Sequence, residues 1–128
     1  MKPTLPGRRG ACAALLTIAL AAATSAAAPP HFELARSEPA AGDTVSAVSS
    51  VSLWFSEPPQ EGSVSIHLLD AASELVPAGD PVADDEDPSL YRIKSSDPLP
   101  TGDYVVTWRG MGDDGHVVRD DFDFTVAR

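Results

Sequence analysis

The strongest constraint on the fold is a period of two in the apolar residues of four short segments. Apolar residues alternate with other residues at Val51, Leu53 and Phe55; Val64, Ile66 and Leu68; Tyr104, Val106 and Trp108; and Phe122, Phe124 and Val126. Successive side chains of a strand point to opposite faces, so this alternation predicts half-buried β-strands. Segments rich in proline, glycine and aspartate separate them, and no stretch has a convincing helical period. At 128 residues the chain has room for one domain, and we predict a single Greek-key β-barrel or sandwich.

The first 28 residues have the composition of a secretion signal. Lys2, Arg8 and Arg9 are basic, residues 11–28 are apolar and rich in alanine, and small residues occupy 25–28. This pattern predicts a cleavable signal peptide over 1–28 and a mature domain over 29–128. A retained transmembrane anchor is the alternative, but the small residues that end the apolar run favour cleavage, after which we expect no membrane insertion.

Removal of the signal peptide would change the chemistry of the chain. The only cysteine, Cys12, lies in it, so the mature domain can form no disulfide and must be held together by its core. Residues 29–128 contain six Lys or Arg and 19 Asp or Glu, a formal charge of −13. Such a negative surface promotes solubility, disfavours the binding of nucleic acid and anionic lipid, and mildly favours the binding of cations.

The four acids of 84–87 lack the ligand spacing of a calcium-binding loop, and we expect 79–88 to be a solvated loop.

The sequence gives no support to a hydrolase or transferase. It has neither a G-x-S-x-G nucleophile motif nor a glycine-rich phosphate loop, and the mature domain has no cysteine nucleophile. Metal binding is better supported. We interpret the segment around Asp114 and His116 as strand, in which residues two apart share a face, with Cα atoms about 6–7 Å apart.

His31 strengthens this half of a metal site because it lies close to the predicted cleavage point. As a terminal residue it would offer both an imidazole and an α-amine, whose pKa of about 7.7–8 allows a metal to displace the proton. Two imidazoles, one amine and the Asp114 carboxylate suit Cu(II), with Zn(II) as the rival ion. A Cu(I) site is not expected, because Met111 is the only sulfur ligand of residues 29–128. His67 alternates with apolar residues, and we expect it to face solvent without a role.

Four segments, taken in order, resemble the CopC family of periplasmic copper-resistance proteins. "HFELARSEPAAG" has a histidine start and a Ser-x-Pro-Ala-x-Gly turn, and "VSLWFSEP" is an apolar strand that ends Phe-Ser-Glu. "LPTGDYVVTWRGMGDDGH" leads through Trp-Arg to Asp-x-His, and "FDFTV" is similar to the last strand of the family. These segments span residues 31–126, and their shared order makes the resemblance specific.

The resemblance implies a small β-barrel or sandwich of cupredoxin-like or immunoglobulin-like arrangement. It also implies a Cu(II) site made from the amine and imidazole of His31 together with Asp114 and His116. Glu57 matches a family glutamate near the copper, and the alternative for Glu57 is a solvent-facing acid at a strand end. The implied function is a periplasmic, monomeric, non-enzymatic protein that buffers copper or delivers it to a CopD-type inner-membrane transporter.

Three departures from the family pattern bear on this function. The middle of the chain lacks the methionine-rich segment that binds Cu(I) in some members. Val117 and Asp120 replace a proline and a glycine that are common after the Asp-x-His pair. Pro29 and Pro30 separate His31 from the alanine run, so cleavage after Ala27 would leave His31 with an amide in place of an amine. Such a protein would bind copper less tightly.

Two other functions remain open at this point. One is a metal-free immunoglobulin-like interaction module with a degenerate copper site, which the Pro-Pro insertion favours. The other is a copper enzyme, because a terminal histidine with a second histidine is similar to the histidine brace of oxidative polysaccharide-cleaving enzymes. In that comparison Asp114 would fill a position that those enzymes keep for exogenous ligands, so we expect no catalysis.

Overall fold

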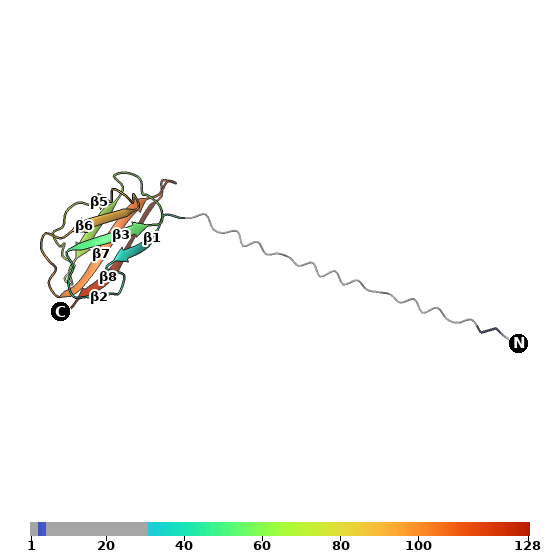
Figure 1. The fold of residues 1–128 in the computed structure, drawn as a ribbon, viewed down its shortest axis with the longest axis horizontal. Helices are drawn as coiled ribbons and strands as arrows, with labels where there is room; N and C mark the ends of the chain where they lie inside the picture. Colours follow the sequence, from blue (N-terminus) through green and yellow to red (C-terminus); the bar gives the residue numbers. More distant parts are fainter. Residues whose placement is uncertain (1–2, 5–30) are drawn as a thin grey trace.

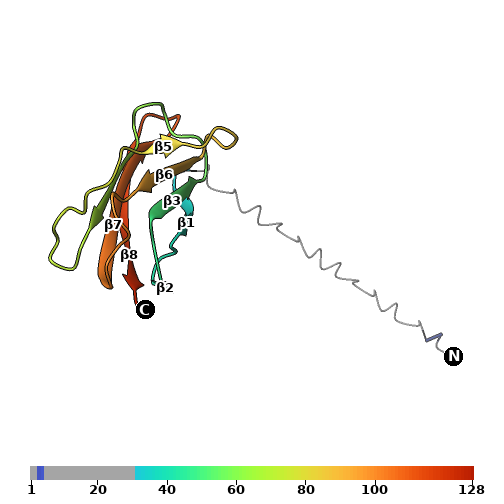
Figure 2. The ribbon, with the colours of Figure 1, turned by 60° about the vertical axis from the view of Figure 1, so that its left-hand side comes forward.

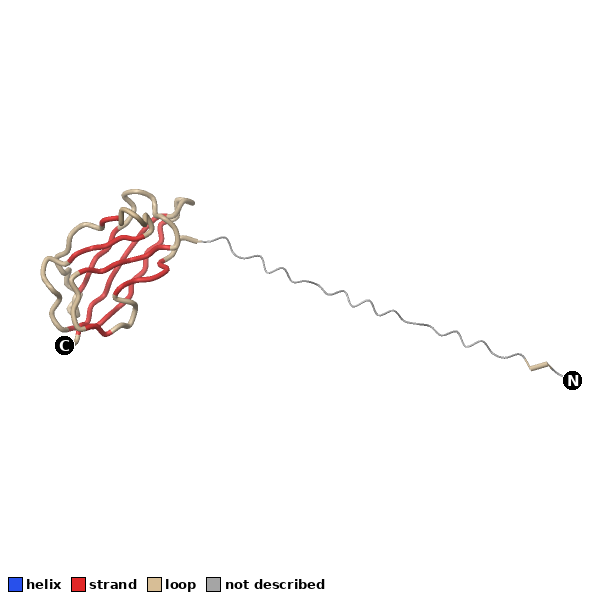
Figure 3. The backbone as a smooth tube through the Cα atoms, in the orientation of Figure 1, coloured by secondary structure: helices blue, strands red, loops and turns tan. Residues whose placement is uncertain are grey.

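The computed structural model describes residues 3–4 and 31–128, and the rest of the predicted signal peptide lies outside the described residues. The described chain forms strands and no helix (Figure 3). The strands are β1 (Leu34–Glu38), β2 (Thr44–Val45), β3 (Ser50–Phe55), β4 (Ser65–Leu69), β5 (Val82–Ala83), β6 (Leu90–Lys94), β7 (Gly102–Met111) and β8 (Val117–Val126). All four alternating segments therefore contribute strands, which confirms the predicted all-β class.

The strands form two sheets that pack face to face (Figures 1 and 2). One sheet has the order β1-β3-β6-β5 and the other β2-β8-β7-β4. All neighbours are antiparallel except β2 and β8, which run parallel. Of the two predicted architectures, the structure has the sandwich. In Figures 1 and 2 the start of the domain and the β7–β8 turn lie at the same end, opposite the C-terminus.

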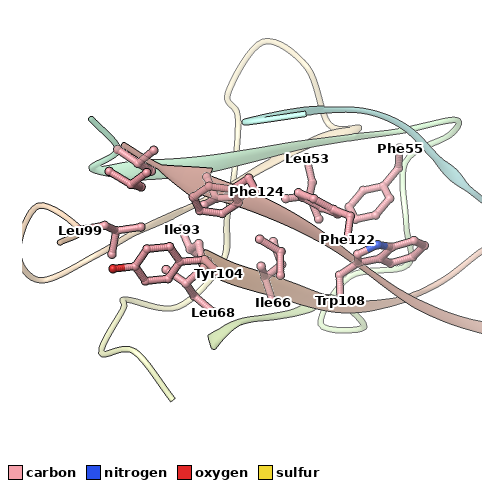
Figure 4. Packing of buried hydrophobic residues seen from close by; sticks show 14 of the residues in the cluster. Leu53, Phe55, Ile66, Leu68, Ile93, Leu99, Tyr104, Trp108, Phe122 and Phe124 are labelled. Atoms are coloured by element: carbon pink, nitrogen blue, oxygen red, sulfur yellow. The ribbon is translucent and has the colours of Figure 1, made fainter. Parts of the chain in front are cut away.

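The inward faces of both sheets supply the core. Of the twelve alternating apolar residues, all are buried except Val64, which is partly buried against the cluster. Figure 4 shows Phe55 and Trp108 at one end of the core and Leu99 and Tyr104 at the other. Each fully buried large side chain contributes about 1.5–3 kcal/mol, so this core can hold the domain without a disulfide. Among residues 3–4 and 31–128, no buried side-chain polar atom lacks a hydrogen bond.

The segment of Asp114 and His116 is a turn, so the interpretation of these residues as part of a strand is wrong. β7 ends at Met111, β8 begins at Val117, and residues 112–116 connect them. Gly115 has a φ of +80°, a left-handed conformation that glycine adopts without strain. Its N–H donates to the Gly112 carbonyl at 3.0 Å, which closes the turn. The alternation of apolar and polar residues cannot reveal such a turn. Gly110, Gly112 and Gly115 carry neither an apolar nor a polar side chain, so they do not interrupt the pattern that predicts a strand.

The acidic segment 79–88 is more ordered than a simple solvated loop. It contains the short strand β5, which pairs with β6. Asp84 accepts hydrogen bonds from the Arg92 guanidinium at 2.8 Å and from the Glu86 and Asp87 N–H groups. The Arg92 contact in particular holds the pKa of Asp84 below its usual value.

Candidate metal centre

Three segments that are distant in sequence meet at the end of the sandwich where the described domain begins: 31–33, 56–60 and 112–116. The Ser56 hydroxyl donates to the His31 carbonyl at 3.2 Å. The Gln60 amide Nε2 donates to the Gly112 carbonyl at 2.8 Å, and the Gln60 N–H donates to the Met111 carbonyl at 2.8 Å. The segment after β3 therefore binds both the start of the domain and the β7–β8 turn.

Phe32 fixes the chain immediately after His31. Its side chain is 4% exposed, stacks on Phe55 with ring centroids 5.0 Å apart, and meets Trp108 edge-on at 6.4 Å. A Cβ atom on Gly110 would lie 2.8 Å from the Phe32 ring, so the ring needs a glycine at this point of β7. His31 itself is exposed, but its neighbour is locked into the core.

Asp114 and His116 contact each other within the turn. Asp114 Oδ2 lies 2.8 Å from His116 Nδ1, and Asp114 Oδ1 accepts the His116 N–H at 3.0 Å. The side-chain hydrogen bond is the main reason why the pKa of Asp114 is below its usual value and the pKa of His116 is above its own. Both side chains of the pair are open to solvent.

Glu57 lies beside the same turn. Its Oε1 is 3.4 Å from the Asp113 N–H. A Cβ atom on Gly112 would lie 2.7 Å from Glu57 Oε1, 2.8 Å from Phe32 Cβ and 3.4 Å from Asp114 Oδ1. Glu57, Phe32 and Asp114 therefore pack around Gly112. Glu57 is half-buried and faces the turn, so it does not project freely into solvent.

The structure brings the sequence-predicted residues His31, Asp114, His116 and Glu57 to one end of the molecule. Within the part of the chain that the structure describes, no three His, Cys, Asp or Glu side chains converge closely enough to hold a metal ion. The ligand set is thus a prediction that the side-chain positions do not test. His67 lies elsewhere, exposed on β4 and opposite Thr107 of β7, as expected for a solvent-facing residue.

Sequence reasoning did not single out the residues that hold this end together, namely Phe32, Ser56, Gln60 and Gly112. Ser56 lies in the Phe-Ser-Glu stretch, so the motif already marked its position. The glycines of "RGMGDDG" gave a weaker signal, since a glycine between polar residues is typical of many turns.

Among the described residues, no helix has the length and apolar character needed to span a membrane.

Comparisons with known proteins show the family of this chain. The family model described as the CopC domain matches residues 34–127. Copper resistance protein C from Escherichia coli is 30% identical over 124 residues, which cover 88% of this chain and 94% of that protein.

Two solved structures share the fold at similar identity. CopC from Methylosinus trichosporium OB3b has a TM-score of 0.68 at 31% identity and covers 75% of this chain and 93% of its own. PcoC, a methionine-rich copper resistance protein from Escherichia coli, also has a TM-score of 0.68 at 31% identity and covers 77% of this chain and 100% of its own. Both the sequence and the fold therefore show that this chain belongs to the CopC family.

Proposed function

We propose that this protein is exported to the periplasm, loses residues 1–28, and there binds Cu(II) through His31, Asp114 and His116. It buffers the ion or delivers it to a CopD-type inner-membrane transporter, and it acts as a monomer without catalysis. Family membership supports a role in copper handling, since the relatives are named as copper resistance proteins. In this proposal copper is the cargo, and His31, Asp114 and His116 would supply its ligands.

The observation that carries the proposal is the 2.8 Å separation of Asp114 Oδ2 and His116 Nδ1. Two ligand atoms that bind one metal at about 2.0 Å each and at a right angle are about 2.8 Å apart. A metal ion could therefore replace the shared proton once the two side chains rotate to direct their lone pairs at it, because the ion would lie to one side of the O–N line. The backbone of the turn would not need to change. Because Asp114 and His116 are exposed, this exchange would need no opening of the core.

The remaining ligands would come from His31. The Ser56 hydroxyl holds the His31 carbonyl and the buried Phe32 anchors the next residue, so the imidazole would need only side-chain rotations. The His31 amine would join it once Pro29 and Pro30 are also trimmed. Glu57 would lie beside the ion as a hydrogen-bond acceptor or an occasional ligand. Nitrogen and carboxylate ligands favour Cu(II) over Cu(I), and Met111 is the single methionine of 29–128.

Titration of the exported protein with Cu(II), followed by EPR, tests the proposal. We expect one tightly bound ion and a type-2 spectrum. His116→Ala should abolish tight binding, because it removes a ligand of the Asp114–His116 pair. His67→Ala is the control, and it should bind as the wild type does, since His67 lies on the outer face of β4. The absence of a tight one-to-one complex in the wild-type protein would contradict the proposal.

One specific observation favours a second function, a metal-free interaction module with a degenerate site. Pro29 and Pro30 stand between the alanine run and His31, and they would block the His31 amine unless they are trimmed. The intact mass of the exported protein separates the two functions. A chain that begins at His31 supports copper binding, whereas a chain that begins at Ala28 supports the degenerate module.

A further inference from the structure

Ser56 makes three hydrogen bonds to the two residues that flank Phe32. Its N–H donates to the Glu33 carbonyl at 2.8 Å, and its hydroxyl donates to the His31 carbonyl at 3.2 Å. The same hydroxyl oxygen accepts the Glu33 N–H at 3.0 Å. One serine at the end of β3 thus holds three backbone groups of the segment that precedes β1.

The position of Ser56 explains why a side chain is needed here. The β1–β3 ladder is irregular at its open end, with a shift between Leu34 and Arg36, and its last partners are Leu34 and Phe55. Beyond this pair the backbone of β3 offers only the Ser56 N–H to the incoming chain. The hydroxyl extends the pairing by one residue, to the carbonyl of His31, which no strand partner reaches.

The hydroxyl and the core hold the segment from two sides. Phe32 is buried between Phe55 and Trp108, which fixes the direction of the chain but leaves the peptide plane before it free to turn. The bond from Ser56 to the His31 carbonyl fixes that plane. With both contacts in place, the Cα of His31 has a defined direction with respect to the β7–β8 turn.

We propose that Ser56 is a positioning residue for the N-terminal copper ligand. Its hydroxyl orients the His31 backbone so that the amine and the imidazole face Asp114 and His116, and Ser56 itself does not bind the metal. This role rests on the proposed function, because it concerns the same site. The backbone groups that the Ser56 hydroxyl binds are exposed. Removal of the hydroxyl would therefore cost the fold little stability, but it would loosen His31.

The test compares three variants of the exported protein with the wild type. Ser56→Ala removes the hydroxyl, and Ser56→Thr retains it. Ser95→Ala is the matched control, because the Ser95 hydroxyl also contacts backbone carbonyls, those of Ser49 and Asp97, but at the opposite end of β3. Three quantities are measured: Cu(II) affinity by competition with a chelator, the EPR spectrum of the bound ion, and amide exchange of Glu33 without metal.

We expect Ser56→Ala to weaken Cu(II) binding about ten-fold, the equivalent of about 1.4 kcal/mol for two lost hydrogen bonds. Its EPR parameters should shift or split into several species, and its Glu33 amide should exchange faster. Ser56→Thr should restore all three properties, and Ser95→Ala should change none.

The amide exchange measurement needs no metal, so it separates failure of this inference from failure of the proposed function. If Ser56→Ala frees the Glu33 amide but leaves Cu(II) affinity and the EPR spectrum as in the wild type, the positioning role is wrong and the copper site stands. An equal loss of affinity in Ser95→Ala would also overturn the role, since it would show a general effect on the fold. If the wild type binds no Cu(II), the proposed function fails and the positioning role fails with it.

Discussion

At the residue scale, the pair of Asp114 and His116 combines the clearest sequence signal with the clearest geometry. The Asp-x-His spacing identified both residues, and the structure shows that they form a hydrogen bond. The sequence could not predict that bond, because residues two apart point in parallel on a strand but can face each other across a turn. The left-handed conformation of Gly115 makes this segment a turn and not a strand.

The Asp114–His116 bond gives a prediction for pH dependence in the metal-free protein. The pKa of Asp114 is lowered, so its contribution to stability is present above about pH 3.9 and disappears as the pH falls through the folded-state pKa. The pKa of His116 is raised, so its contribution is present below about pH 6.5 and disappears as the pH rises through its own folded-state pKa. The bond is therefore at full strength between about pH 4 and 6.5.

An NMR titration of the histidine ring protons measures this bond directly. In the wild type the midpoint of His116 should lie above about 6.5, and in Asp114→Asn it should return toward about 6.5, because the imidazolium loses its carboxylate. His67, which is exposed on β4, serves as the internal reference in both proteins. Equal His116 midpoints in the two proteins would show that the bond does not form in solution.

At the scale of elements, the alternating strands β3, β4, β7 and β8 were predictable, whereas β2, β5, β6 and the connections were not. Alternation within β3, β4, β7 and β8 specifies which face of each strand is buried, so the two-layer packing follows from local patterns. The short strand β5 escaped prediction because two residues cannot show a period. The packing of the β7–β8 turn on Phe32 and Glu57 also escaped it, since it joins residues far apart in the sequence.

Gly112→Ala tests the packing of this turn without changing any proposed ligand. The added Cβ would lie 2.7 Å from Glu57 Oε1 and 2.8 Å from Phe32 Cβ, so both contacts must be relieved by a shift of these groups or of the turn. Overpacking of this kind costs about 1–3 kcal/mol, and we expect a loss of that order in the free energy of unfolding, together with weaker Cu(II) binding. Denaturant unfolding and chelator competition measure the two effects.

Gly79→Ala is the matched control for this substitution. A Cβ on Gly79 would meet only the Lys94 carbonyl oxygen, at 4.0 Å, so the change should shift stability by no more than about 0.5 kcal/mol. If Gly112→Ala were as stable as Gly79→Ala and bound Cu(II) as well as the wild type, the close packing of the turn would have no bearing on the site.

At the scale of the whole molecule, the sandwich brings the first residues of the described domain and the β7–β8 turn to one end. The order of four motifs along 31–126 was enough to identify the family, and with it the fold. That the segment of His31 and the β7–β8 turn lie at the same end could not be read from any local pattern, because it depends on how β1 and the β7–β8 hairpin are placed in opposite sheets. Phe32 lies in the first motif, but its burial, which anchors the start of the domain at this end, was not predicted.

If the proposed function is right, two imidazoles from distant parts of the chain bind one Cu(II) ion. Pulsed EPR of the copper-loaded exported protein counts bound imidazoles through the modulation from their remote nitrogens. The account predicts two imidazoles in the wild type and in His67→Ala, and one in His31→Ala, which lacks that ring. A single imidazole in the wild-type protein, or two that persist in His31→Ala, would contradict it.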